Sequence, residues 1–107
     1  MSKVYLIQET GKWNLSPARD FGEIEVLLPP DFQLMFDAKN IVKHLQEKLE
    51  KITTKDYLLL AGDPALIGIA SAIVADYLDG EMTLLKWDRQ EKIYIPITLS
   101  LYGEENE

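Results

Sequence analysis

The most constraining feature of this chain is an unbroken apolar run that passes through a tight turn into an apolar helix. Residues 57–61 (YLLLA) do not alternate with polar residues, which is typical of a strand buried on both faces inside a parallel sheet. Gly62 makes the turn, Asp63 is a helix N-cap, and Pro64 suits the first helical position. The sequence therefore predicts a strand-to-helix junction at the centre of an α/β domain.

The helix after this junction has no polar side. We expect it to run to about Leu78, closed by Gly80, and residues 64–75 are apolar around the whole circumference. Its smallest residues form one face suited to close packing: Ala65, Gly68, Ala72 and Ala75. One sheet does not easily cover such a helix on all sides, so we expect a second covering element.

Four more strands and one more helix surround this centre. The strands are expected at residues 4–8, 23–28, 82–87 and 93–101, and Pro96 marks the last of them as an edge strand. An amphipathic helix follows an N-cap at Asp37 and extends to Ile52, and residues 10–22 form a loop. The order β-β-α-β-α-β-β predicts an α/β fold with a reduced Rossmann-like sheet of about five strands, whose core is mostly parallel and whose C-terminal edge strand is antiparallel.

Composition limits the classes of protein to which the chain can belong. A length of 107 residues with 47% apolar content predicts one domain over residues 1–107, with a frayed polar tail at residues 104–107. The absence of cysteine excludes disulfides and cysteine-built metal sites. A net charge of −7 disfavours nucleic acid as a partner, and no apolar stretch is long enough for a membrane span or a signal peptide.

The carboxyl edge of the predicted sheet is the candidate ligand site. If strands 57–61 and 82–87 are parallel, the residues after them meet where open α/β sheets bind ligands. These residues are Gly62, Asp63, Trp87, Asp88 and Arg89, joined by Glu9 and Thr10 if the first strand is also parallel. A helix N-terminus attracts anions, and carboxylates beside an arginine can bind a metal or transfer protons. A capped helix and a charged hairpin turn explain the same residues without a ligand, and we favour that simpler interpretation.

No set of catalytic residues stands out in the sequence. His44 is the single histidine and lies beside the polar face of its helix, so multi-histidine metal sites and Cys–His catalysis are excluded. Ser71 lies within the apolar helix and not in a nucleophile elbow. We therefore expect no catalytic residue, no bound metal and no cofactor, and we favour a protein that is not an enzyme.

Two stretches of the chain resemble a known family. Residues 58–70 (LLLAGDPALIGIA) and 84–96 (LLKWDRQEKIYIP) are similar to small uncharacterised proteins encoded by marine bacteriophages, especially phages of cyanobacteria. The similarity covers residues 56–102. It implies synthesis in the cytoplasm of an infected bacterium, and it transfers no catalytic residue.

Two hypotheses of function, from different classes, follow. The first is a phage accessory protein that binds protein, as a homodimer and with a host or phage partner. The dimer is expected to bury part of helix 64–78 or the sheet face opposite the first helix, because a large apolar surface is rarely left in water. Alternatively, the aromatic loops cover that surface in a monomer, through Trp13, Phe21, Phe32 and Phe36. The second hypothesis is a small-ligand or nucleotide-binding domain that uses the carboxyl edge.

Overall fold

The computed structural model describes residues 2–11, 14–32 and 38–103, and in this part of the chain the predicted α/β fold is confirmed. Five strands form one sheet: β1 (Lys3–Gln8), β2 (Glu23–Leu28), β3 (Tyr57–Leu59), β4 (Glu81–Asp88) and β5 (Ile93–Ser100). Their order is β2-β1-β3-β4-β5, parallel throughout except for the antiparallel β4–β5 pair. The strand after residue 56 is internal and the last strand lies at an edge, as expected.

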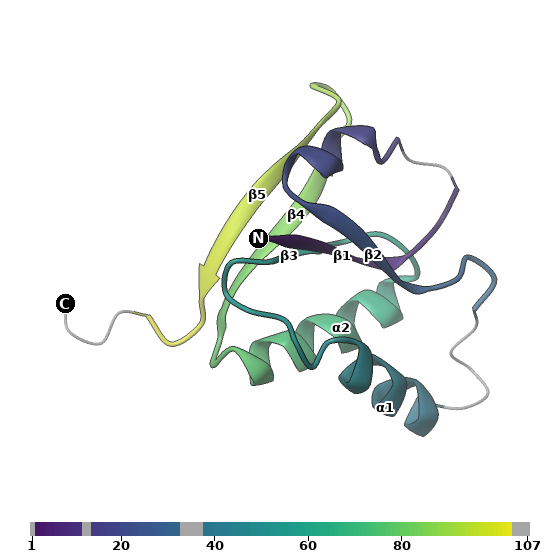
Figure 1. The fold of residues 1–107 in the computed structure, drawn as a ribbon, viewed down its shortest axis with the longest axis vertical. Helices are drawn as coiled ribbons and strands as arrows, with labels where there is room; N and C mark the ends of the chain where they lie inside the picture. The colour runs from purple at the N-terminus through teal and green to yellow at the C-terminus, as the bar shows by residue number, and fades with distance from the viewer. Residues whose placement is uncertain (1, 12–13, 33–37, 104–107) are drawn as a thin grey trace.

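Two helices cover one face of the sheet and a short 3-10 helix covers the other (Figure 1). The helices α1 (Ala38–Lys48) and α2 (Pro64–Tyr77) lie on what we call the helix side. The 3-10 helix η1 (Ser16–Asp20) lies on the opposite face, which we call the η1 side. Alternation along the strands divides the core, so that Tyr5 and Ile7 pack on the helix side while Val4 and Leu6 pack on the η1 side.

The α1 helix ends earlier than its apolar stripe predicts. The helix stops at Lys48, yet Leu49 and Ile52 stay buried in a tight turn, because the Ile52 N–H donates to the Leu49 carbonyl. Asp56 then connects this turn to β1. One of its carboxylate oxygens accepts from the Thr53 N–H and the other from the Lys3 N–H, each at 2.8 Å. The predicted N-cap at Asp37 lies outside the described residues.

The segment expected as a plain loop at residues 10–22 is a covering element. Its 3-10 helix buries Ala18 completely, and the Phe21 ring packs edge-on against Tyr57 with the ring centroids 5.2 Å apart. Phe32 packs against the helix-side core, so two of the four predicted covering aromatics do cover the sheet. Trp13 and Phe36 lie outside the described residues. On the face opposite α1, the segment therefore covers the central strands, where Val4, Leu6, Leu59 and Leu85 are buried.

The α2 helix is buried on the side that packs against the sheet and α1, and the described part of the chain does not cover its other flank. Leu66, Ala70, Ile73 and Val74 are buried against the sheet. Three members of the predicted small-residue face, Ala65, Gly68 and Ala72, are exposed. The physical reason is that α1 and the sheet are the elements that pack against α2, and neither reaches this flank.

Candidate functional site

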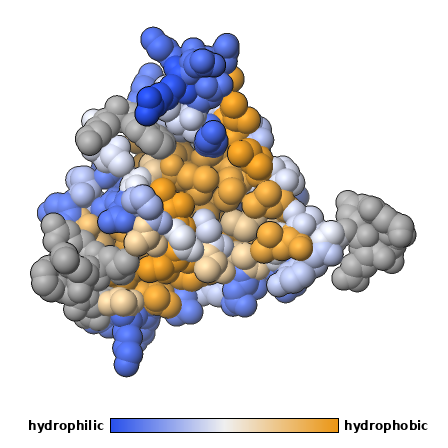
Figure 2. Space-filling model, turned by 180° about the vertical axis from the view of Figure 1, so that it is seen from behind, coloured by the Kyte–Doolittle hydropathy of each residue, from blue (hydrophilic) through white to orange (hydrophobic). Residues whose placement is uncertain are grey.

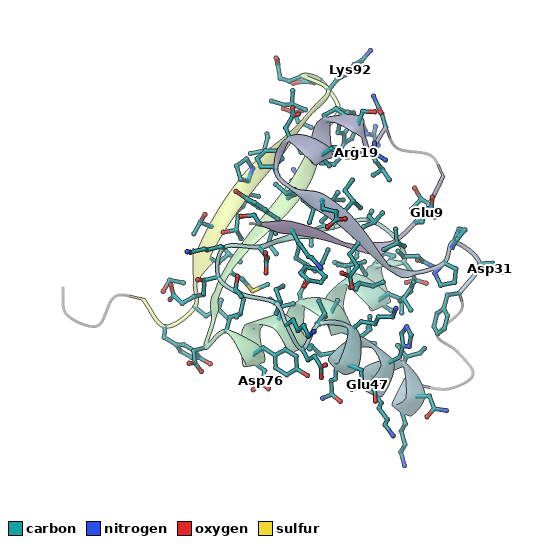
Figure 3. The ribbon with its side chains drawn as sticks, viewed as in Figure 1. Glu9, Arg19, Asp31, Glu47, Asp76 and Lys92 are labelled. Carbon is teal, nitrogen blue, oxygen red and sulfur yellow. The ribbon has the colours of Figure 1, made fainter. Side chains whose placement is uncertain are left out.

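The structure brings the segments of the predicted ligand site to one edge of the sheet, with the segment after β4 in a hairpin that projects from it. Because β3 and β4 are parallel, with Leu59 opposite Leu85, the segment Gly62–Asp63 after β3 and the segment Trp87–Arg89 at the end of β4 lie at the same edge. The β4 strand continues three residues past Leu85, or about 10 Å, as part of a projecting hairpin. The twist of the sheet turns this hairpin away from β1, so that Lys92 at its tip lies apart from Glu9 (Figure 3).

The predicted residues also use their polar atoms locally. The Asp63 carboxylate accepts from the Ala65 N–H at 2.8 Å as an N-cap, and the Asp88 carboxylate accepts from the Gln90 N–H at 3.1 Å within the hairpin turn. Among the described residues the one ion pair is Lys3–Glu25, at 3.2 Å, so Arg89 forms none there. The described part of the chain contains no cluster of three acidic or histidine side chains that could hold a metal ion.

The N-terminus of α2 offers few free donors to an anion. The Asp63 N–H donates to Oε1 of Gln8 at 2.8 Å, Pro64 has no N–H, and the Ala65 N–H donates to its own cap. Phosphate binding at a helix N-terminus depends on such groups pointing at the ligand. The first residues of this helix are thus committed to internal hydrogen bonds.

Gln8 organises this edge, and our sequence analysis did not single it out. Its side chain is only 5% exposed, and its Nε2 donates to the carbonyls of Pro29 and Phe32, at 3.1 and 3.2 Å. Together with the hydrogen bond from the Asp63 N–H, these bonds connect the end of β1 to the segments that follow β2 and β3. Gly62, at φ +120°, lies so close that an added Cβ would stand 2.4 Å from Cβ of Gln8. The sequence signal that could have identified Gln8 is its position as a polar residue at the end of a buried apolar strand, because a buried polar side chain needs hydrogen-bond partners.

Trp87 packs against the η1-side core. Its ring centroid lies 4.8 Å from that of Tyr94, whose hydroxyl donates to the Asn14 carbonyl at 3.0 Å. Burial raises the pKa of the Tyr94 hydroxyl above its ordinary value. Since side chains alternate along a strand, Trp87 and its neighbour Asp88 lie on opposite sides of β4.

The hollow found at the carboxyl edge is small. It measures about 50 Å³ and is lined by Leu6, Glu9, Thr10, Gly11, Leu15 and Ala61. It lies where the connections from β1 and β3 diverge to opposite faces of the sheet, which is the usual ligand position in open α/β sheets. None of the five predicted ligand residues lines it, and ligand pockets are commonly several times larger.

The most distinctive surface lies on the helix side of β5. Ile93, Ile95 and Ile97 are 48%, 38% and 36% exposed, although their side chains point to the same side as the partly buried Leu99. The helices do not reach them: α1 lies over β2, where Nε2 of His44 is 3.4 Å from the Leu27 carbonyl, and α2 lies over β1 and β4. We call Ile93, Ile95 and Ile97, with their cross-strand neighbour Leu84, the apolar face.

Seen from behind, the molecule carries hydrophobic surface from below the polar hairpin tip across the middle of the view (Figure 2). The strict alternation of residues 93–101 predicted one apolar side for this strand. The exposure of that side could not be predicted, because it depends on how far α2 extends across the sheet.

Comparison with known proteins identifies a phage family. The model of the family described as "Phage Pam3 gp32-like protein" matches residues 2–101, which is nearly the whole chain. Neither the curated proteins nor the solved structures contain a significant match. None of the helices in the described part of the chain has the length and hydrophobicity needed to cross a bilayer. The chain belongs to the family of phage Pam3 gp32-like proteins.

Proposed function

We propose that this phage protein acts by binding protein rather than by catalysis, and that the apolar face is its contact surface, first of all for a second copy of the chain. The observation that carries the proposal is the row of three exposed isoleucines, Ile93, Ile95 and Ile97, on a side of the sheet that the helices leave open. Soluble proteins seldom leave a contiguous apolar patch of this kind in water.

The free energy available from this face sets the expected strength of the dimer. Burying the exposed part of each isoleucine stabilises by about 1 kcal/mol, hence on the order of 6 kcal/mol for the six in a symmetrical pair. The cost of association is subtracted from this gross free energy, so a stable pair needs further contact area. Further area is available on α2, where the exposed Ala65, Gly68 and Ala72 form a flank of small residues suited to close approach. We therefore expect a dimer that uses both surfaces.

Charge favours a second copy as the occupant. Lys86 and Asp88 lie on the helix side of β4, directly across from Ile95 and Ile93. A surface that holds one positive and one negative group side by side is complementary to itself when a twofold axis runs the strands antiparallel. Lys86 of one copy then approaches Asp88 of the other, twice. The rest of the chain, with its net charge of −7, would otherwise repel its own copy.

The setting of this function is also part of the proposal. We place it in the cytoplasm of the infected cell, and the similarity of residues 58–70 and 84–96 to marine phage proteins supports a cyanobacterial host. A host or phage protein would bind the dimer at surfaces that the pairing leaves free.

A small-ligand function is the second candidate. The hollow at the divergence of β1 and β3 favours it, although its volume of about 50 Å³ suits a small ion or a water better than a nucleotide. A thermal-shift panel of nucleotides, phosphate and divalent metals separates the two candidates, since a ligand that binds the folded state raises the melting temperature.

Sedimentation equilibrium on matched variants tests the protein-binding function. Ile95→Lys places a charge in the apolar face, and Val26→Lys places the same charge at a residue that is 39% exposed on the η1 side of the other edge strand. We expect wild type and Val26→Lys to dimerise at micromolar concentration and Ile95→Lys to remain near 12.2 kDa while keeping its circular dichroism. Equal masses for the two variants would overturn the proposal.

A further inference from the structure

The backbone of β5 offers a second way for two copies to meet, and it must be weighed against the apolar face. An edge strand presents unpaired N–H and C=O groups, which can pair with another chain and extend the sheet. β5 is eight residues long and lies at the end of the sheet, so this route is open in principle.

The register of the sheet shows which groups of β5 point outward. The Leu60 N–H donates to the Leu85 carbonyl at 3.1 Å, so the backbone of Leu85 points toward β3. Leu85 lies opposite Pro96, and the two therefore form a pair without mutual hydrogen bonds. The backbone groups of Pro96, and by alternation those of Tyr94, Thr98 and Ser100, then face away from the sheet.

Proline at the centre of this row blocks sheet extension. Pro96 has no N–H to donate, and its ring occupies the space that a neighbouring strand would need. At the far end, the Ser100 carbonyl already accepts from the Gly103 N–H at 3.3 Å. The outward N–H and C=O groups that remain on each side of Pro96 are too few to form a stable antiparallel ladder between two copies.

We infer that the second copy docks face to face on Ile93, Ile95 and Ile97, and that Pro96 prevents the two β5 strands from pairing edge to edge. This inference rests on the proposed dimer and specifies its geometry. It also assigns a role to Pro96: this residue prevents a long edge strand rich in isoleucine from pairing with further chains into an open-ended sheet.

Hydrogen exchange by NMR on the full chain tests this geometry at two concentrations, one where sedimentation shows monomer and one where it shows dimer. For face-to-face docking, the outward amides of Tyr94 and Thr98 should change their exchange rates by less than about twofold, while the side-chain methyl resonances of the three isoleucines shift. The amide of Ile97, which points into the sheet, serves as the internal reference. Slowing of the Tyr94 and Thr98 amides by about tenfold or more in the dimer would overturn the inference and leave the proposed dimer intact.

The variant Pro96→Val gives an independent readout, because it restores an N–H at the centre of the outward row. We expect its dimer Kd to stay within about threefold of wild type, and assemblies larger than a dimer to appear at high concentration as the edge opens. A Kd tightened by about tenfold with unchanged stoichiometry would mean that wild-type copies pair through this edge. A wild-type chain that is monomeric at every concentration would instead refute the proposed dimer, and this inference with it.

Discussion

Replacing Gln8 by methionine tests whether one side chain holds the carboxyl edge together. Methionine keeps the length of the side chain but loses the hydrogen bonds to the Asp63 N–H and to the carbonyls of Pro29, Pro30 and Phe32. Each such bond contributes about 1 kcal/mol. Pro29 and Pro30 are exposed, so their carbonyls can turn to water, and we expect a net loss of about 2 kcal/mol from the other two bonds. For a domain of this size that lowers the melting temperature by roughly 8–16 °C.

Urea denaturation followed by circular dichroism measures this loss, with Gln46→Met as the control. Gln46 is exposed on α1, and the interaction found for it uses its backbone carbonyl, which the substitution retains. The control should lie within about 0.5 kcal/mol of wild type, with the same m value for all three proteins. If Gln8→Met were as stable as the control, the three segments would not depend on this side chain, and our description of the edge would be wrong.

Further predictions concern the same edge, the buried tyrosine and the charges of the apolar face. Gly62→Ala should destabilise by about 3 kcal/mol, measured in the same assay, because its φ of +120° and the 2.4 Å approach to Gln8 both oppose a side chain. The raised pKa of Tyr94 means that the unfolded chain releases this proton first as pH rises above about 10, so stability should fall from there upward, and less steeply in Tyr94→Phe. In sedimentation experiments, Lys86→Glu and Asp88→Lys should each weaken the dimer alone, whereas mixing the two variants should restore it, because both cross-copy pairs regain opposite charges.

The fold could be predicted from the sequence because its strongest signals are local. The unbroken run at residues 57–61 and the Gly62-Asp63-Pro64 junction depend on nearest neighbours, and both are confirmed, with the strand shortened to Tyr57–Leu59. Pro96 similarly marked the edge strand before any packing was known. The mostly parallel core followed from the two crossover helices.

The functional surfaces could not be predicted as well, because they depend on relations between distant segments. The candidate site depends on how closely Asp63 and Asp88 approach each other. That distance is set by the twist of the sheet and by the length of the β4–β5 hairpin, and neither can be read from the two residues and their neighbours. Gln8 was missed because its partners lie more than twenty residues away in two different loops. Ile93, Ile95 and Ile97 are exposed because α2 lies over β1 and β4 and does not reach β5. The position of α2 on the sheet depends on tertiary packing, which local sequence patterns do not reveal.

Cross-linking through a single introduced cysteine tests the central claim most directly, because the chain has none of its own. Ile95→Cys places a thiol in the apolar face, and Val26→Cys places one at a similarly exposed residue on the other edge strand and the other side of the sheet. With a short bismaleimide at micromolar concentration, the account predicts a covalent dimer of twice 12.2 kDa from Ile95→Cys and uncross-linked monomer from Val26→Cys. Equal yields from the two variants, or a dimer from Val26→Cys alone, would contradict the assignment of this face as the contact surface.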